Sequence, residues 1–250
     1  MTALQKLLET FRQASVTERE KDTYFEELIL CYLRNEATYR DLYSDVWTYS
    51  DWAKLQGLDR RDTGIDLVAK TGGTGEYHAI QCKLYAEDYC LQKGDIDSFF
   101  TASGKKPFTH RIIIATTNKW SEPAEDALQN QQQPVSKIDL HDLENSQIDW
   151  SHYHAKSKPT LKTKKQLRDH QRYARDTVKH GLSTADRGKL IMACGTGKTF
   201  TALKIAKALA GAGKRVLFLV PRLNLLSQTL TEWTQESATP LHMPTTAWKR

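Results

Sequence analysis

The sequence lacks the features that would place the protein in a membrane or outside the cell. No run of about 18 apolar residues is present to span a bilayer. The first residues, MTALQKLLETFRQ, have no apolar centre of the kind found in signal peptides. Cysteine is scarce and forms no CxxC pair, which argues against a disulfide framework and against a zinc site. We therefore expect a cytoplasmic protein with no membrane partner and with reduced, structural cysteines (Cys31, Cys82, Cys90 and Cys194).

Charge is distributed unevenly along the 250 residues. Residues 1–155 contain 17 Lys and Arg against 25 Asp and Glu, whereas residues 156–250 contain 19 against 5. A basic block attracts polyanions because their counterions are released, so nucleic acid or nucleotide phosphate is the expected partner of the C-terminal part. A basic surface that is merely solvated is the alternative.

Residues 1–150 have the pattern of an α/β domain. Apolar residues at helical spacing predict a helix over 22–35, opened by a capping box of Thr23 and Glu26. Two strand-like runs, 65–70 and 77–84, flank the segment TGGTGE, whose glycines suit a reversal between antiparallel strands. Further elements are expected in the order helix, strand, helix and strand (95–102, 111–117, 123–131 and 135–140). Strands interleaved with helices predict an α/β core.

The composition changes after Asp149, where lysines and a proline replace apolar periodicity, as in an exposed linker. We therefore place one domain at 1–150, a linker at 151–165 and a second, incomplete domain at 166–250. The second domain should contain, in order, a helix (167–179), a strand (189–193), a glycine loop (194–197), a second helix and a buried parallel strand (216–220). The second helix should have Ala202, Ile205, Ala206 and Leu209 as its apolar stripe.

The segment CGTGKT between this expected strand and helix has the context of a phosphate-binding loop. Glycines allow backbone N–H groups to approach phosphate oxygens, and the helix N-terminus adds positive potential. Lys198 would reach the β- and γ-phosphates, and the hydroxyl of Thr199 would coordinate Mg²⁺. The expected nucleotide-binding residues of the loop are Gly195, Thr196, Gly197, Lys198 and Thr199.

This loop resembles the first motif of superfamily 2 helicases and translocases, which commonly relax the first glycine of the template, here replaced by Met192. In the same resemblance, Gln171 in LRDHQ would read the adenine edge, and VPRLNLLSQ would contact the DNA backbone. An exposed glutamine and a solvated Arg222 are the alternatives. No apolar strand ending in Asp-Glu follows Val220, so we expect no appreciable ATP hydrolysis from this segment alone, and we interpret the chain as the N-terminal piece of a longer enzyme.

The hairpin carries an unusual set of polar residues. Alternation along a strand places Gln81 and Lys83 on one face and Ile80 and Cys82 on the other, and the pairing can bring Asp66 to Gln81 and Lys83. Asp66 and Gln81 would supply oxygen ligands for Mg²⁺, and Lys83 would position a water or stabilise the phosphate during phosphodiester hydrolysis. The alternative is a sheet edge whose charges prevent aggregation.

The pattern resembles the PD-(D/E)xK nuclease superfamily, in its Mrr-like branch with GxD followed by QxK, over about residues 24–143. Ile65 stands where that superfamily has proline, and Gln81 replaces its second acid. The resemblance also implies an acidic residue on the preceding helix, for which Glu26 is the candidate and Glu27 the competitor. The candidate catalytic residues are therefore Asp66, Gln81, Lys83 and Glu26, with Asp66, Gln81 and Cys82 as metal ligands. Arg60 and Arg61 are candidate contacts to DNA.

A nuclease followed by such a motor is similar to the single-polypeptide type I (type ISP) restriction-modification enzymes. The resemblance implies a restriction-endonuclease-like mixed sheet flanked by helices, then a partial RecA-like α/β lobe. It also implies a bacterial Mg²⁺-dependent DNA endonuclease acting on double-stranded DNA. An ATP-driven motor, with ATP and Mg²⁺ as cofactors, would be followed by methyltransferase and target-recognition domains in the same longer chain. The alternative is a repair helicase whose nuclease-like domain is an inactive DNA-binding module.

Overall fold

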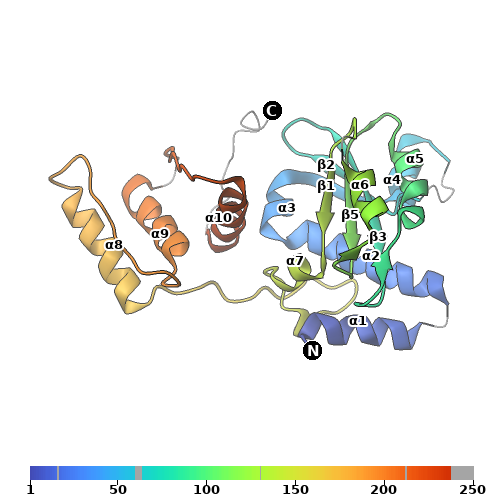
Figure 1. Ribbon diagram of the computed structural model, residues 1–250, viewed down its shortest axis with the longest axis horizontal. Coiled ribbons are helices and arrows are strands. Elements are labelled where there is room, and N and C mark those ends of the chain that lie inside the picture. The colour runs from blue at the N-terminus through green and yellow to red at the C-terminus, as the bar shows by residue number, and fades with distance from the viewer. Residues whose placement is uncertain (16, 60–63, 130, 212, 238–250) are drawn as a thin grey trace. The chain divides into compact units, whose positions relative to one another are not determined.

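The protein divides into two compact units, Met1–Lys162 and Thr163–Arg250, each of which is described by itself. The computed structural model describes residues 1–15, 17–59, 64–129, 131–211 and 213–237 (Figure 1). The candidate DNA contacts Arg60 and Arg61 lie outside the described residues. The division falls inside the segment 151–165 that the sequence suggests as a linker.

The first unit is built on a five-stranded mixed sheet with the strand order β1-β2-β3-β5-β7. β2 is antiparallel to both of its neighbours, β1 and β3, whereas β5 and β7 continue the sheet parallel to β3. The predicted hairpin is confirmed, with Leu67 opposite Ile80 and Lys70 opposite Tyr77. The strands are β1 (Tyr43–Thr48), β2 (Leu67–Thr71), β3 (Tyr77–Lys83), β5 (Phe108–Ala115) and β7 (Val135–Ile138), with a small separate pair β4 (Cys90–Leu91) and β6 (Lys119–Trp120).

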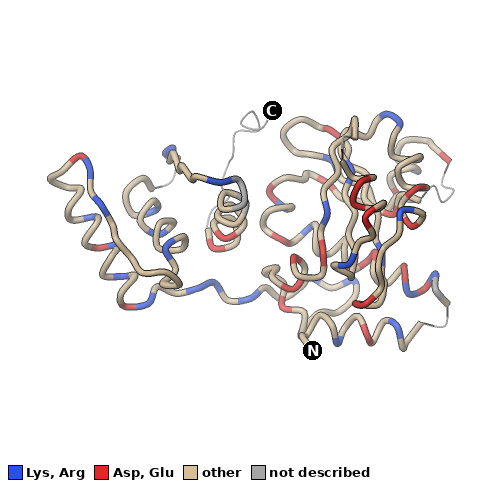
Figure 2. Tube along the Cα trace, in the orientation of Figure 1, with Lys and Arg blue, Asp and Glu red and all other residues tan. Residues whose placement is uncertain are grey.

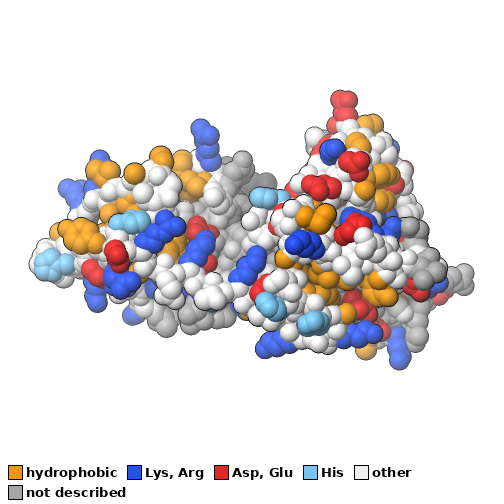
Figure 3. Space-filling view, turned by 90° about the horizontal axis from the view of Figure 1, so that it is seen from below, with side chains coloured by type: hydrophobic (Ala, Val, Ile, Leu, Met, Phe, Trp, Pro, Cys, Tyr) orange, Lys and Arg blue, Asp and Glu red, His pale blue; other side chains and the backbone are white. Residues whose placement is uncertain are grey.

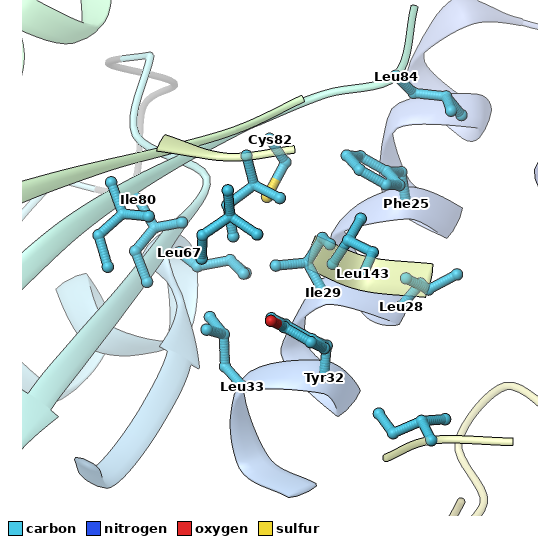
Figure 4. Packing of buried hydrophobic residues seen from close by; sticks show 14 of the residues in the cluster. Phe25, Leu28, Ile29, Tyr32, Leu33, Leu67, Ile80, Cys82, Leu84 and Leu143 are labelled. Carbon is cyan, nitrogen blue, oxygen red and sulfur yellow. The ribbon is translucent and has the colours of Figure 1, made fainter. Parts of the chain in front are cut away.

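Helices cover both faces of this sheet, and each face has its own apolar core. On one face, Phe25, Leu28 and Ile29 of α2 pack against Leu67 and Ile80 (Figure 4). The other face packs around Trp52, Val68 and Phe99. The helices are α1 (Ala3–Ala14), α2 (Glu18–Asn35), α3 (Ala37–Leu42), α4 (Tyr49–Gln56), α5 (Asp97–Ser103), α6 (Glu122–Leu128) and α7 (Leu140–Glu144), with short 3₁₀ turns at Lys93–Asp95 and Trp150–His152.

The predicted start of the second helix is wrong. α2 begins at Glu18, and the capping box is formed by Thr17 and Glu20 rather than by Thr23 and Glu26. Thr23 lies inside the helix, where its hydroxyl donates to the carbonyl of Arg19 at 2.8 Å. The same Ser/Thr-x-x-Glu spacing thus occurs twice, and the upstream copy caps the helix because its threonine has extended backbone geometry.

The first half of the expected linker is folded into the first unit. Tyr153 is buried in the core on the α2 face, and the indole N–H of Trp150 donates to the carbonyl of Leu143 at 2.8 Å. A β-bridge then joins Ile148 to Leu161. Aromatic side chains within a lysine-rich stretch account for this packing, because they bury large apolar areas.

The second unit contains α8 (Asp169–Gly181), α9 (Lys198–Ala210) and α10 (Leu223–Glu236). α9 ends at Gly211 as predicted, but its buried side chains are Phe200, Thr201 and Leu203, whereas Leu209 of the expected stripe is 46% exposed. The indole N–H of Trp233 donates to the carbonyl of Thr199 and ties α10 to the start of α9.

The strands predicted at 189–193 and 216–220 are not formed in the described part of the chain. Both segments lack ladder partners, and Ile191 and Leu217 are 80% and 84% exposed. A buried parallel strand requires neighbours that pair its backbone and helices that cover its apolar side chains. An apolar run alone therefore does not make a strand. Among the described residues, no helix combines the length and the apolar character needed to cross a membrane.

Candidate active site and phosphate loop

Asp66 lies at the point where β2 separates from β3. Its backbone N–H donates to the carbonyl of Ile80 at 3.0 Å, and its carbonyl accepts from the N–H of Tyr49 at 2.8 Å. Oδ2 of its side chain accepts a hydrogen bond from the N–H of Cys82 at 2.6 Å. The carboxylate thus takes the place of a backbone carbonyl as the partner of β3. These three bonds fix the carboxylate beside the C-terminal end of β3.

Cys82 presents different groups to the core and to this strand end. Its side chain is buried with Ile80 on the α2 face, as the alternation predicts (Figure 4). Burial raises the pKa of its thiol well above the ordinary value, and the Asp66 carboxylate raises it further. A thiol held protonated in this way is a poor metal ligand. The backbone N–H of Cys82 faces Asp66 and donates to its carboxylate. Its carbonyl lies on the same side of the strand, since the N–H and C=O of one strand residue point to the same side.

One polar atom of Gln81 has no hydrogen-bond partner among the described residues. Its side chain is 2% exposed, and Nε2 donates to the carbonyl of Gly64 at 3.2 Å. Its Oε1 is buried and accepts no hydrogen bond from the described residues. A buried oxygen without a donor costs free energy, which a bound cation or water would recover.

Gly64 positions the GID segment against α5. Its φ of +83° is strained for a residue with a side chain, and a Cβ there would meet Oγ of Ser98 at 2.9 Å. Its carbonyl also holds the amide of Gln81. The glycine therefore links the backbone before Asp66 to the side chain of Gln81.

Charges from two elements act on the Cys82 thiol. The carboxylates of Asp66, Glu26 and Asp22 raise its pKa, and the ammonium group of Lys83 lowers it. Glu26 of α2 and Asp66 thus both act on the side chain of Cys82. Glu27 instead forms an ion pair with Lys156 at 3.7 Å. Of the two candidate glutamates, Glu26 is the one whose charge acts on Cys82.

Three neighbours of this strand end were not among the residues selected from the sequence. Gly64 was part of the motif but had no role, and Asp22 lies one helical turn before Glu26. Thr116 follows β5. Its N–H donates to the carbonyl of Lys83 at 3.0 Å, and its hydroxyl donates to the carbonyl of Tyr85 at 2.7 Å. Polar residues directly after a buried strand, as in RIIIATT, are the signal that could have indicated it.

The donor set at this strand end is suited to a hard cation. In the described residues, no three His, Cys, Asp or Glu side chains come together as a complete metal cage. The candidate oxygen ligands are instead the Asp66 carboxylate, the carbonyl of Cys82 and the amide oxygen of Gln81, which accepts no hydrogen bond from the described residues. Mg²⁺ binds few protein oxygens and keeps several waters, so these residues fit it.

The expected phosphate loop precedes α9. Gly195 and Gly197 have φ of +75° and +78°, which turn the backbone towards the helix N-terminus. The amine of Lys198 donates to the carbonyl of Ala193 at 2.9 Å, so its side chain lies back along the loop. Thr199 is in the first turn of α9, directly after Lys198.

Gln171 contacts this loop from α8. Nε2 donates to the carbonyl of Thr196 at 2.9 Å, and Oε1 accepts from the N–H of Arg168 at 3.0 Å. A Cβ on Gly197 would lie 2.5 Å from Nε2, so only glycine permits this approach. A cavity of about 340 Å³ lies beside the contact, lined by Lys165, Gln166, Arg168, Gln171, Gly195, Thr196, Gly197, Phe200 and Glu232.

The fold is that of a restriction-endonuclease-like domain followed by a helicase-like region. The chain belongs to the restriction endonuclease family, whose Mrr-type profile matches residues 34–160. A second profile, described as "Type III restriction enzyme, res subunit", matches residues 164–248. The predicted fold class is confirmed.

Solved structures extend this assignment. The chain is 34% identical, with a TM-score of 0.74, to the ATP-dependent type ISP restriction-modification enzyme LlaBIII bound to DNA, over 93% of this chain and 15% of that one. The predicted resemblance to type ISP enzymes is confirmed, and the chain spans about one seventh of that relative. The modification-dependent restriction endonuclease AspBHI is 16% identical with a TM-score of 0.40, over 57% of this chain and 34% of that one, which is too distant for an argument. No curated protein gives a significant match.

Proposed function

We propose that residues 1–162 form a Mg²⁺-dependent endonuclease that cleaves double-stranded DNA, within a cytoplasmic restriction-modification enzyme driven by ATP. The observation that carries the proposal is the arrangement of Asp66 and Gln81 at one strand end. There, the Cys82 N–H anchors the Asp66 carboxylate, and the preceding residue of β3, Gln81, has a buried amide oxygen that accepts no hydrogen bond in the described residues.

Each side chain has a distinct task in this proposal. Asp66, Gln81 and the carbonyl of Cys82 hold the cation, and Glu26 adds negative charge from α2. Mg²⁺, when bound, supplies polarisation of the phosphoryl oxygen and a more acidic water. Lys83 orients the attacking water and stabilises negative charge on the phosphate. Thr116 fixes the backbone of Lys83.

The test is nicking of supercoiled plasmid by the 250-residue chain in Mg²⁺ and in EDTA. We expect nicking in Mg²⁺ alone, and loss of it in Asp66→Asn. Asp45→Asn is the matched control, because Asp45 is an exposed carboxylate on β1. Equal nicking by the Asp66 and Asp45 variants would exclude the proposed site. Binding of plasmid without any metal-dependent nicking would support an inactive DNA-binding module instead.

Nucleotide binding by the second unit is a separate part of the proposal. Gly195–Thr199 would bind the phosphates of ATP with Mg²⁺, and Gln171 would lie beside the base. A ligand of the folded state raises its stability, so ATP–Mg²⁺ should raise the unfolding midpoint of the second unit. Lys198→Ala should lose this shift, and Lys214→Ala, which removes an exposed lysine outside the loop, should keep it.

A further inference from the structure

One side of α8 carries a row of basic side chains, of which only the first, Arg168, also lines the cavity beside the loop. The row consists of Arg168, Arg172, Arg175 and Lys179, with Arg168 at the N-cap of the helix. At 3.6 residues per turn, the four positions lie within an arc of about 60°. The row is about 16 Å long at 1.5 Å per residue. We call it the α8 basic row; Figure 2 shows Lys and Arg recurring along this helix.

The α8 basic row is exposed and poorly neutralised. Arg168, Arg172 and Lys179 are exposed and have no ion pair with a carboxylate of the described residues, and Arg175 pairs with Asp176 at 2.8 Å. Asp176 is also influenced by Lys179 and Arg172, which lower its pKa after the larger effect of Arg175. Three cations therefore gather around one carboxylate.

Two acidic side chains elsewhere in this unit lie near a lysine that is not part of the row. Glu232 and Glu236 both lie near Lys165, at 3.1 and 4.0 Å. On the face seen in Figure 3, basic side chains are spread over this unit with fewer acidic ones among them. Crowded like charges reduce stability unless a counter-charge is present, so this row is suited to an external polyanion.

We propose that the α8 basic row binds the phosphate backbone of duplex DNA, without reading its sequence. The inference rests on the proposed function only in taking DNA as the partner. A row about 16 Å long is longer than the spacing of neighbouring charges along a duplex, so that it can contact more than one phosphate. Arginine and lysine on a helix side supply charge and hydrogen bonds to phosphate but no base readout. The buried face of α8, with Gln171 and Ala174, remains against the unit, so the row can contact DNA without unfolding.

The test measures binding of the chain to a short fluorescent duplex by anisotropy, at several salt concentrations. Arg172→Ala combined with Lys179→Ala should weaken binding. It should also make the negative slope of log K against log salt less steep by up to about 1.8, at about 0.9 for each lost contact. A second duplex of unrelated sequence should give the same change.

A relocation variant separates a specific surface from net charge. It carries the same two alanines together with Thr177→Lys and His180→Lys, exposed positions on the other side of α8. Its net charge equals that of the wild type, yet we expect binding to remain weak. Wild-type slopes in the double-alanine variant, or full recovery in the relocation variant, would overturn the inference. Absence of metal-dependent nicking by the wild type would instead count against the proposed nuclease, whatever the salt slopes.

Discussion

Oδ2 of Asp66 accepts a hydrogen bond from the backbone N–H of Cys82 at 2.6 Å, at the position where β2 no longer pairs with β3. The carboxylate therefore replaces a backbone acceptor of the sheet. One side chain serves both the structure of the strand end and the proposed chemistry, and substitutions can separate these two roles.

Substitution of Asp66 should separate stability from cleavage. Asp66→Ala leaves the N–H of Cys82 without an acceptor, so we expect a loss of about 1–3 kcal/mol in unfolding free energy together with loss of nicking. Asp66→Asn retains an acceptor oxygen but no charge, and should lose nicking with a smaller loss of stability. Urea unfolding and plasmid nicking measure the two effects, and equal destabilisation by both variants would contradict the structural role.

Gln81→Glu should make stability more dependent on metal. The new carboxylate would be buried near Asp66, so repulsion and desolvation should destabilise the variant in EDTA. Mg²⁺ should then raise its unfolding midpoint more than that of the wild type. Gln81→Met, of similar length but without an oxygen ligand, is the control and should respond least. An identical Mg²⁺ response in all three proteins would exclude Gln81 as a ligand.

Gly64→Ala should disturb the site through the backbone. The left-handed conformation costs about 1–2 kcal/mol for a residue with a side chain, and the added Cβ would crowd Oγ of Ser98. We expect lower stability and slower nicking than in Gly73→Ala, where the Cβ would meet nothing within 4 Å. Thermal unfolding and nicking rates provide the comparison, and two indistinguishable variants would refute the positioning role of Gly64.

Stability of the first unit should fall in mild acid because of His78. Burial, with a smaller contribution from the neighbouring His110, lowers the pKa of His78 from 6.5 to about 4, although Glu76 acts in the opposite direction. The unfolded chain therefore binds more protons than the folded chain between these values. The stability of the fold with a neutral His78 is therefore fully present above about pH 6.5, and it falls as the pH is lowered towards 4.

His78→Phe should reduce this acid dependence. Nδ1 of His78 and the hydroxyl of Tyr43 share a hydrogen bond at 3.0 Å. Because phenylalanine cannot form this bond, the variant should also lose some stability at pH 7. Urea unfolding at pH 7, 6 and 5 measures the slope, with His154→Asn, at an exposed position, as the control. A slope as steep in His78→Phe as in the wild type would contradict the assignment.

The hairpin was predictable because its signal is local. Alternation placed Ile80 and Cys82 in the core on one face, and the glycines of TGGTGE marked the reversal. The start of α2 was not predictable, because Thr17 and Thr23 have the same spacing to a glutamate and only the folded backbone distinguishes them. The expected strand at 216–220 failed for a related reason, since apolar character does not provide a pairing partner.

The sequence by itself determined the order of the motifs, the GxD and QxK residues and the loop before α9, because these depend on residue type and short spacing. The tertiary structure settled that the Asp66 carboxylate accepts from the Cys82 N–H and that Glu27 pairs with Lys156. It also left Oε1 of Gln81 without a donor among the described residues. These features depend on contacts between segments far apart in the chain, and no local pattern specifies which atoms meet there.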